Sequence, residues 1–142
     1  MATYTKYETF VENLANKLID AFGTTDTWRA VIHTDAPVVA TDNALADLTQ
    51  ITGSNGYTTG GESITFNSTR TGGTVTATAT DVTWTASGGN LGNSTTGRYF
   101  SIYDDTSAGD NLLCNFDYSA TFTVATGETM TLDFGTSLFT LA

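Results

Sequence analysis

The first hydrophobic pattern along the chain has the period of an α-helix. Between Tyr4 and Phe22, large apolar side chains recur three or four residues apart and would form one stripe on a helix. The stripe consists of Tyr7, Phe10, Val11, Leu14, Leu18 and Phe22. Thr5 and Glu8 match a capping box at the start, and Gly23 can take the left-handed conformation that ends a helix. We therefore expect one amphipathic helix in residues 1–23.

Residues 24–61 are less regular and predict a strand, a loop and a short helix. The stretch 28–32 is β-prone, and the only proline, Pro37, ends it and begins a loop. Asp42 or Asn43 would cap a short helix over residues 44–48. Gly-rich residues 53–61 then predict a turn-rich connection.

From Glu62 onward the hydrophobic period is two, which predicts a body of short strands over residues 62–142. Threonines alternate with Val and Ala at residues 74–80, so the threonine rows should face solvent or a partner. Residues 98–103 are apolar on both faces and predict a central strand covered on both sides. Leu112, Cys114, Phe116 and Tyr118 should share one face of the next strand. Phe122 should lie in a separate strand.

Eight or nine such strands behind one helix indicate a mainly β fold. We expect a jelly-roll-like antiparallel β sandwich preceded by an N-terminal amphipathic helix. The length of 142 residues fits a single domain, 1–142.

The amino-acid composition argues against several classes of function. Charged residues make up 14% of the chain, whereas threonine occurs 31 times, so uncharged hydroxyl groups supply most of the polar surface. A net charge of −10 argues against nucleic acid and anionic membranes as partners. The N-terminus lacks the pattern of a secretory signal. Cys114 is the only cysteine, and we expect it in the core.

Few residues are candidates for catalysis or for ligand binding. His33 and Asp35 are close enough in sequence to act together as a His–Asp pair in general-base catalysis. However, the sequence shows no nucleophile in a recognisable motif. The loop 104–111 is rich in oxygen ligands, yet it fails the EF-hand spacing and predicts a hairpin turn rather than a calcium site. Six aromatic residues are candidates either for a sugar-binding platform or for the core: Trp28, Tyr57, Trp84, Tyr99, Tyr103 and Tyr118. We expect no catalytic residue, metal or cofactor.

Short segments along most of the chain carry a resemblance to a known family. They comprise residues 6–15, 46–51, 55–61, 84–89, 103–106, 117–118, 127–129 and 138–142. In these segments the chain resembles small proteins encoded among the virion structural genes of tailed bacteriophages and prophages, described as head decoration, cement or minor structural proteins. The resemblance implies a non-enzymatic virion component, made in the host bacterial cytoplasm. A chain with a net charge of −10 would be repelled by packaged DNA, so we expect it on the outer capsid surface. Similar proteins occur in heads and in tails.

The expected partners are implied by this resemblance. They are the major capsid protein and further copies of the chain, as a dimer or trimer. The predicted contact residues are Tyr7, Phe10, Leu14, Leu18 and Tyr57. The apolar stripe would either dock in a groove of the shell or cover one end of its own sandwich. Alternatives are a tail or fibre component that binds a host surface glycan, and a carbohydrate-active enzyme with paired carboxylates.

Overall fold

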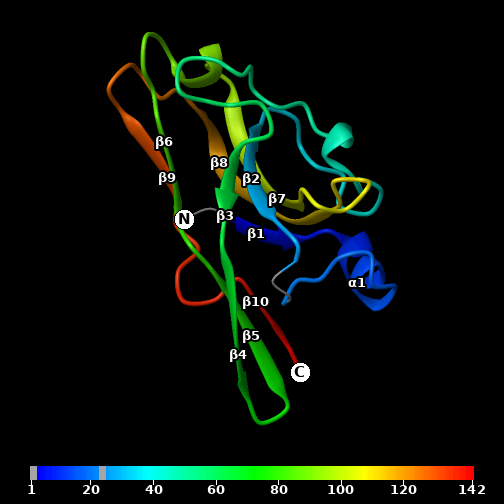
Figure 1. Cartoon of the computed structure of the whole chain (residues 1–142). Helices are drawn as coiled ribbons and strands as arrows, with labels where there is room; N and C mark the ends of the chain where they lie inside the picture. The colour runs from blue at the N-terminus through cyan, green and yellow to red at the C-terminus, as the bar shows by residue number, and fades with distance from the viewer. Residues whose placement is uncertain (1–2, 23–24) are drawn as a thin grey trace.

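A computed structural model describes residues 3–22 and 25–142, and its largest sheet has five antiparallel strands (Figure 1). Their order is β1 (Thr3–Lys6), β8 (Leu112–Phe122), β7 (Gly97–Asp104), β2 (Trp28–His33) and β3 (Glu62–Ile64). The predicted central strand is confirmed, because β7 lies in the middle of this order and is almost entirely buried.

Two smaller sheets complete the fold. One has the order β10 (Phe139–Leu141), β5 (Thr74–Ala79) and β4 (Phe66–Thr71), and the other pairs β6 (Val82–Thr85) with β9 (Thr129–Leu132). Every strand pair in all three sheets is antiparallel. The chain is therefore mainly β with antiparallel sheets in a sandwich-like arrangement, as expected, whereas jelly-roll connectivity is not confirmed.

The main core lies on the inner face of the five-stranded sheet. Ile32, Phe100 and Cys114 from this sheet belong to the same apolar cluster as Trp84 and Leu132 from the β6–β9 ribbon. Cys114 is fully buried, as expected. This cluster closes one face of strands β2, β7 and β8.

A second, smaller core lies on the outer face of the same sheet. Tyr7, Val31, Tyr103 and Leu112 pack there with Leu48 from the segment between β2 and β3. Both faces of the central strands are thus covered, which explains their nearly continuous apolar sequence.

The expectation that Leu112 and Cys114 share one face is wrong. The pairing of β7 with β8 shifts register between Ile102 and Tyr103, so that Ile102 pairs with Cys114 and Tyr103 pairs with Leu112. This bulge places Leu112 in the outer core and Cys114 in the inner core. Phe122 ends β8 and does not begin a separate strand.

The N-terminal segment differs most from its prediction. Thr5 lies in β1, opposite Asn115 of β8, and α1 runs only over Glu8–Ala15 with Tyr7 at its N-cap. The predicted capping box is therefore wrong, because Thr5 is part of the sheet. The predicted end at Gly23 lies outside the described residues.

The helix ends early in a Schellman motif. Leu18 N–H donates to the Asn13 carbonyl at 2.9 Å, and Lys17 N–H donates to the Leu14 carbonyl at 3.2 Å. Lys17 has a φ of 58°, so a lysine occupies the left-handed position that glycine usually takes. The sequence carries no glycine there to signal this end.

The short helix expected at residues 44–48 is a 3-10 turn, η1 (Leu45–Asp47), and a second such turn is η2 (Leu91–Asn93). The predicted cap by Asp42 or Asn43 is replaced by Asp47. Its carboxylate accepts hydrogen bonds from the backbone N–H groups of Asn43 and Ala44. These bonds hold the pKa of Asp47 below its usual value. Among the described residues, no helix is long and apolar enough to span a membrane.

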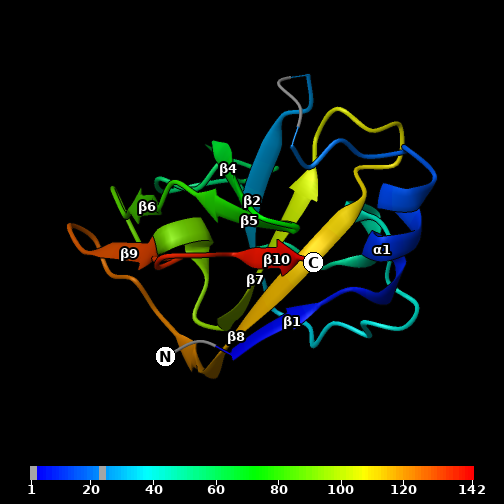
Figure 2. The same ribbon diagram turned by 90° about the horizontal axis from the view of Figure 1, so that it is seen from below.

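The molecule has a projecting arm and two opposed sides. Strands β4 and β5 extend as a hairpin below the body in Figure 1, and β10 pairs with β5. Figure 2 shows α1 at one side of the body and the β6–β9 ribbon at the other.

Candidate functional site

The predicted partner-contact residues do not form a surface stripe. Tyr7 and Phe10 are 0% and 1% exposed, and Tyr57 is buried with its hydroxyl group next to the backbone of Ile32. Leu14 packs partly buried against the main core, and only Leu18, at 57% exposed, faces solvent. As docking residues, Tyr7, Phe10 and Tyr57 are a wrong prediction, since a partner outside this fold would not reach them.

Helix α1 instead covers its own domain. The Phe10 ring contacts Phe139 of β10 edge-to-face, with ring centroids 5.3 Å apart. Phe22 also packs on Phe139, at 5.7 Å between centroids. The apolar stripe therefore joins the helix to the three-stranded sheet, which is the alternative that the sequence left open.

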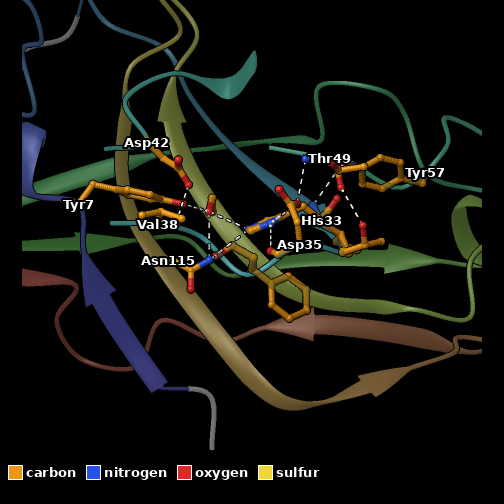
Figure 3. A network of polar contacts seen from close by, with 12 residues as sticks. Tyr7, His33, Asp35, Val38, Asp42, Thr49, Tyr57 and Asn115 are labelled. Carbon is orange, nitrogen blue, oxygen red and sulfur yellow. Dashed lines mark hydrogen bonds and ion pairs between the residues drawn. The ribbon is translucent and has the colours of Figure 1, made fainter. Parts of the chain in front are cut away.

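A buried polar cluster centred on His33 lies between the five-stranded sheet and the segment that covers its outer face (Figure 3). His33 Nε2 lies 3.0 Å from Ser101 Oγ, and His33 Nδ1 lies 3.0 Å from the Asp35 carbonyl oxygen and 3.3 Å from Asp35 Oδ1. Tyr7 Oη is 2.9 Å from the same Ser101 Oγ, and Asn115 Nδ2 is 3.1 Å from His33 Nε2.

These distances fit one assignment of protons. His33 is neutral and donates its Nδ1–H to Asp35, so Nε2 accepts the proton of Ser101. Ser101 Oγ can then accept from Tyr7 Oη, and Asn115 donates to the Phe100 carbonyl at 3.1 Å. A proton on Nε2 would leave one of these donors without an acceptor, and burial lowers the pKa of His33 below its usual 6.5.

The cluster has the residue types of a catalytic triad but is sealed. Ser101, His33 and Asp35 occupy the relative places of nucleophile, base and orienting carboxylate. However, Ser101 and His33 are both 0% exposed, and Ser101 Oγ already lies between Tyr7 and Asn115. The arrangement cross-links β2, β7, β8 and the residue before α1, and it leaves the hydroxyl group no space for a substrate.

The sequence drew attention to His33 and Asp35 but not to their partners. Ser101 is 68 residues from His33, and Asn115 is 82 residues away. Their signal is a polar residue inside a strand that is apolar on both faces, because such a residue must find a buried hydrogen-bond partner.

The acidic loop 104–111 is the hairpin turn that was predicted. Asp104 Oδ1 accepts the backbone N–H groups of Thr106 at 2.8 Å and Ser107 at 3.2 Å. The buried Asp104 carboxyl group also lies next to that of Asp26. Burial, with the repulsion from Asp26, raises the pKa of Asp104 to about 6. Within residues 3–22 and 25–142, no three His, Cys, Asp or Glu side chains are grouped as metal ligands.

Five of the six candidate aromatic residues for sugar binding are buried: Trp28, Tyr57, Trp84, Tyr99 and Tyr103. Only Tyr118 is exposed, at 46%. A platform of stacked aromatic rings is therefore not formed, and these side chains serve the core.

An apolar cavity of about 560 Å³ opens between β1 and residues 130–138, which form β9 and the segment after it. Tyr4, which is 37% exposed, and Tyr118 line it together with Phe116 and Phe134. Tyr4 contacts Phe116 edge-to-face at 5.5 Å between centroids, and Phe116 contacts Phe134 at 5.8 Å. Of the described residues that line the cavity, Asp133 is the only acidic one.

The strand beside this cavity has a free edge. Among the described residues, β1 pairs only with β8, and all four of its residues are exposed. Tyr7 N–H donates to the Leu113 carbonyl in the same register, which makes Thr3 and Thr5 the residues whose backbone groups face β8. The backbone groups of Tyr4 and Lys6 therefore point outward from the sheet.

Comparison with known proteins gave no relative. No family model, no curated protein and no solved structure matches the chain.

Proposed function

We propose that this protein is a non-enzymatic structural protein of a tailed-bacteriophage virion, which decorates the capsid and bridges subunits of the major capsid protein. The class comes from the resemblance of its short sequence segments to decoration and cement proteins. The observation that carries the proposal is an aromatic cavity beside a free sheet edge, which has the two features needed to bind an extended segment of another protein.

The proposed contact is strand addition to β1. The outward backbone groups of Tyr4 and Lys6 would pair with an extended segment of the capsid protein, and a large apolar side chain of that segment would enter the cavity between Tyr4 and Tyr118. Many identical contacts over a symmetric shell would make weak individual binding persistent.

The charge of the molecule supports an outer position. A chain with a net charge of −10 is repelled by packaged DNA and favours a neutral or basic segment as its ligand. The sealing of Ser101 and His33 supports a role without catalysis.

A binding experiment with capsids that lack the protein tests the proposal. Purified protein is added to such capsids, the shells are sedimented, and bound copies per shell are counted. We expect saturation at a fixed stoichiometry and greater resistance of the shells to heat. Binding to tails but not to heads would instead support a tail component.

Two matched variants test the contact surface. Tyr118→Asp places a charge at the rim of the cavity, and we expect it to weaken capsid binding at least ~10-fold, since burying an unpaired charge is costly. Leu18→Asp makes the same kind of change at an exposed apolar residue outside the cavity lining, and it should bind normally. Equal binding by both variants, with circular dichroism unchanged, would exclude the cavity as the contact.

A further inference from the structure

Strand β4 has a free edge without the usual protection against pairing. It is the outermost strand of the order β10-β5-β4, and its residues from Asn67 to Thr71 are all exposed. Its six residues pair with β5 without a register shift. Natural edge strands are commonly protected by proline, lysine, an inward charge, a bulge or a covering element. Within the described part of the chain, strand β4 has none of these features. Its only charged residue is Arg70.

The direction of the backbone groups on β4 can be worked out from one hydrogen bond. Thr80 N–H donates to the Thr65 carbonyl at 3.0 Å, so Thr65 and Thr80 are a hydrogen-bonded pair of the ladder. Because such pairs alternate along an antiparallel ladder, Asn67, Thr69 and Thr71 direct their backbone groups toward β5. The N–H and C=O groups of Phe66, Ser68 and Arg70 therefore point away from the sheet.

These outward groups are complementary to a second copy of themselves. A two-fold axis perpendicular to the sheet at Ser68 would place Ser68 opposite Ser68 of the other copy, and Phe66 opposite Arg70 of the other copy. All three pairs are then of the hydrogen-bonded type, which gives about six new backbone hydrogen bonds. Arg70 would lie opposite Phe66 of the other copy, as a cross-strand pair on one face of the joined sheet.

The two broad faces of the arm also match across this axis. Phe66, Ser68 and Arg70 share a face with Val75 and Ala77, whose register partners on β10 are Leu141 and Phe139. The opposite face consists only of threonine and asparagine: Asn67, Thr69, Thr71, Thr74, Thr76, Thr78 and Thr140. Pairing at Ser68 would continue both faces over six strands.

The distribution of charge also favours a second copy of the chain as the partner at the β4 edge. Between residues 63 and 80 the only charged residue is Arg70, and residues 134–142 contain no charged side chain, although the whole chain carries −10. Two such acidic molecules repel one another in most relative orientations. The repulsion is weakest where their β4 edges face each other.

From these observations we propose that two copies of the protein associate through their β4 strands, antiparallel and centred on Ser68, into a two-fold dimer with a continuous six-stranded sheet. This inference does not depend on the proposed capsid function. It names one surface and one partner, and it leaves β1 and the aromatic cavity of each copy free.

Sedimentation equilibrium over about 1 μM to about 500 μM protein tests the association. We expect a species of twice the 15.0 kDa mass of one chain to form within this range. Ser68→Pro removes an N–H group that the folded monomer does not use, and it should weaken the dimer at least ~10-fold. Ser68→Ala keeps this N–H group and should dimerise normally. A wild-type protein that stays monomeric throughout would overturn the proposal.

Cysteine cross-linking tests the register independently. Ser68→Cys would place two thiols across the axis at the Cα separation of a paired residue, which is compatible with a disulfide. Thr71→Cys is the control, because the two copies of residue 71 would lie roughly 20 Å apart along the strands. The native Cys114 is buried and will not compete. Mild oxidation should cross-link the Ser68→Cys variant at least ~10-fold faster, and equal rates for both variants would contradict the register.

Discussion

At the scale of single residues, the most informative group is His33. Its pKa is lowered because burial disfavours the charged ring, although Asp35 favours it. The folded protein therefore takes up the proton of His33 at a lower pH than the unfolded chain does. A group of this kind destabilises the fold as the pH falls below the unfolded pKa of 6.5.

The contribution of His33 to the free energy of unfolding is expected to decrease as the pH is lowered from about 7.5 to about 5. Urea denaturation at several pH values measures this slope. In His33→Gln the slope between about pH 6.5 and pH 5 should become shallower by up to ~1 kcal/mol per pH unit, because the group that titrates there is gone.

Asp104 changes the free energy of unfolding in the opposite direction as the pH falls, so its effect must be separated from that of His33. Its folded pKa of about 6 lies above the usual 3.8, so the fold gains stability as the pH falls from about 6 toward 3.8. The comparison of His33→Gln with wild type cancels this gain because Asp104 is present in both. An unchanged slope in His33→Gln would show that folding does not lower the pKa of His33.

At the scale of elements, strands were predicted better than the ends of elements. The strands β2, β5 and β7 were predictable because alternation, or apolar residues on both faces, is a local signal that burial reinforces. The helix was predicted too long because the whole apolar stripe was assigned to one helix. Tyr7, Phe10 and Leu14 pack against the domain although α1 ends at Ala15, so their burial does not require a longer helix. Nothing local marks Lys17 as the left-handed residue that ends it.

The candidate site was less predictable than the fold. His33 and Asp35 were recognised because they are close in sequence, whereas Ser101 and Asn115 join them only through the register of β2, β7 and β8. The aromatic cavity likewise forms between Tyr4 and Phe134, which are distant in sequence. Long-range strand pairing creates both features, and a single sequence does not specify this pairing.

The helix end at Lys17 gives a stability prediction. A non-glycine residue at a φ of 58° is strained, so Lys17→Gly should raise the free energy of unfolding by about 0.5–1 kcal/mol. Lys17→Ala removes the same side chain without relieving the backbone and serves as the control. Thermal unfolding measures both, and an equal effect of the two variants would assign the change to the lost side chain.

At the scale of the whole molecule, the distribution of charge is the dominant feature. Of 15 acidic residues, none lies between residues 63 and 80 or after Asp133, so the negative charge belongs to the body and not to the arm or to β10. A partner that carries the same charge, including a second copy, is therefore expected at the arm. A partner that adds a neutral or basic strand is expected at β1.

This distribution predicts how salt changes the self-association. In a dimer joined by β4 edges that carry no acidic residue, the two acidic bodies repel each other. Salt screens this repulsion over a Debye length of about 10 Å at 0.1 M. Raising NaCl from about 50 mM to about 500 mM should therefore strengthen the dimer by roughly 2- to 10-fold in sedimentation equilibrium. Arg70→Glu changes the charge of each arm from +1 to −1, so it should weaken the dimer most at low salt and partly recover at high salt. A dimer of the wild-type protein that weakens with salt would mean that opposite charges hold it together, and this would contradict an interface formed by backbone hydrogen bonds between the β4 edges.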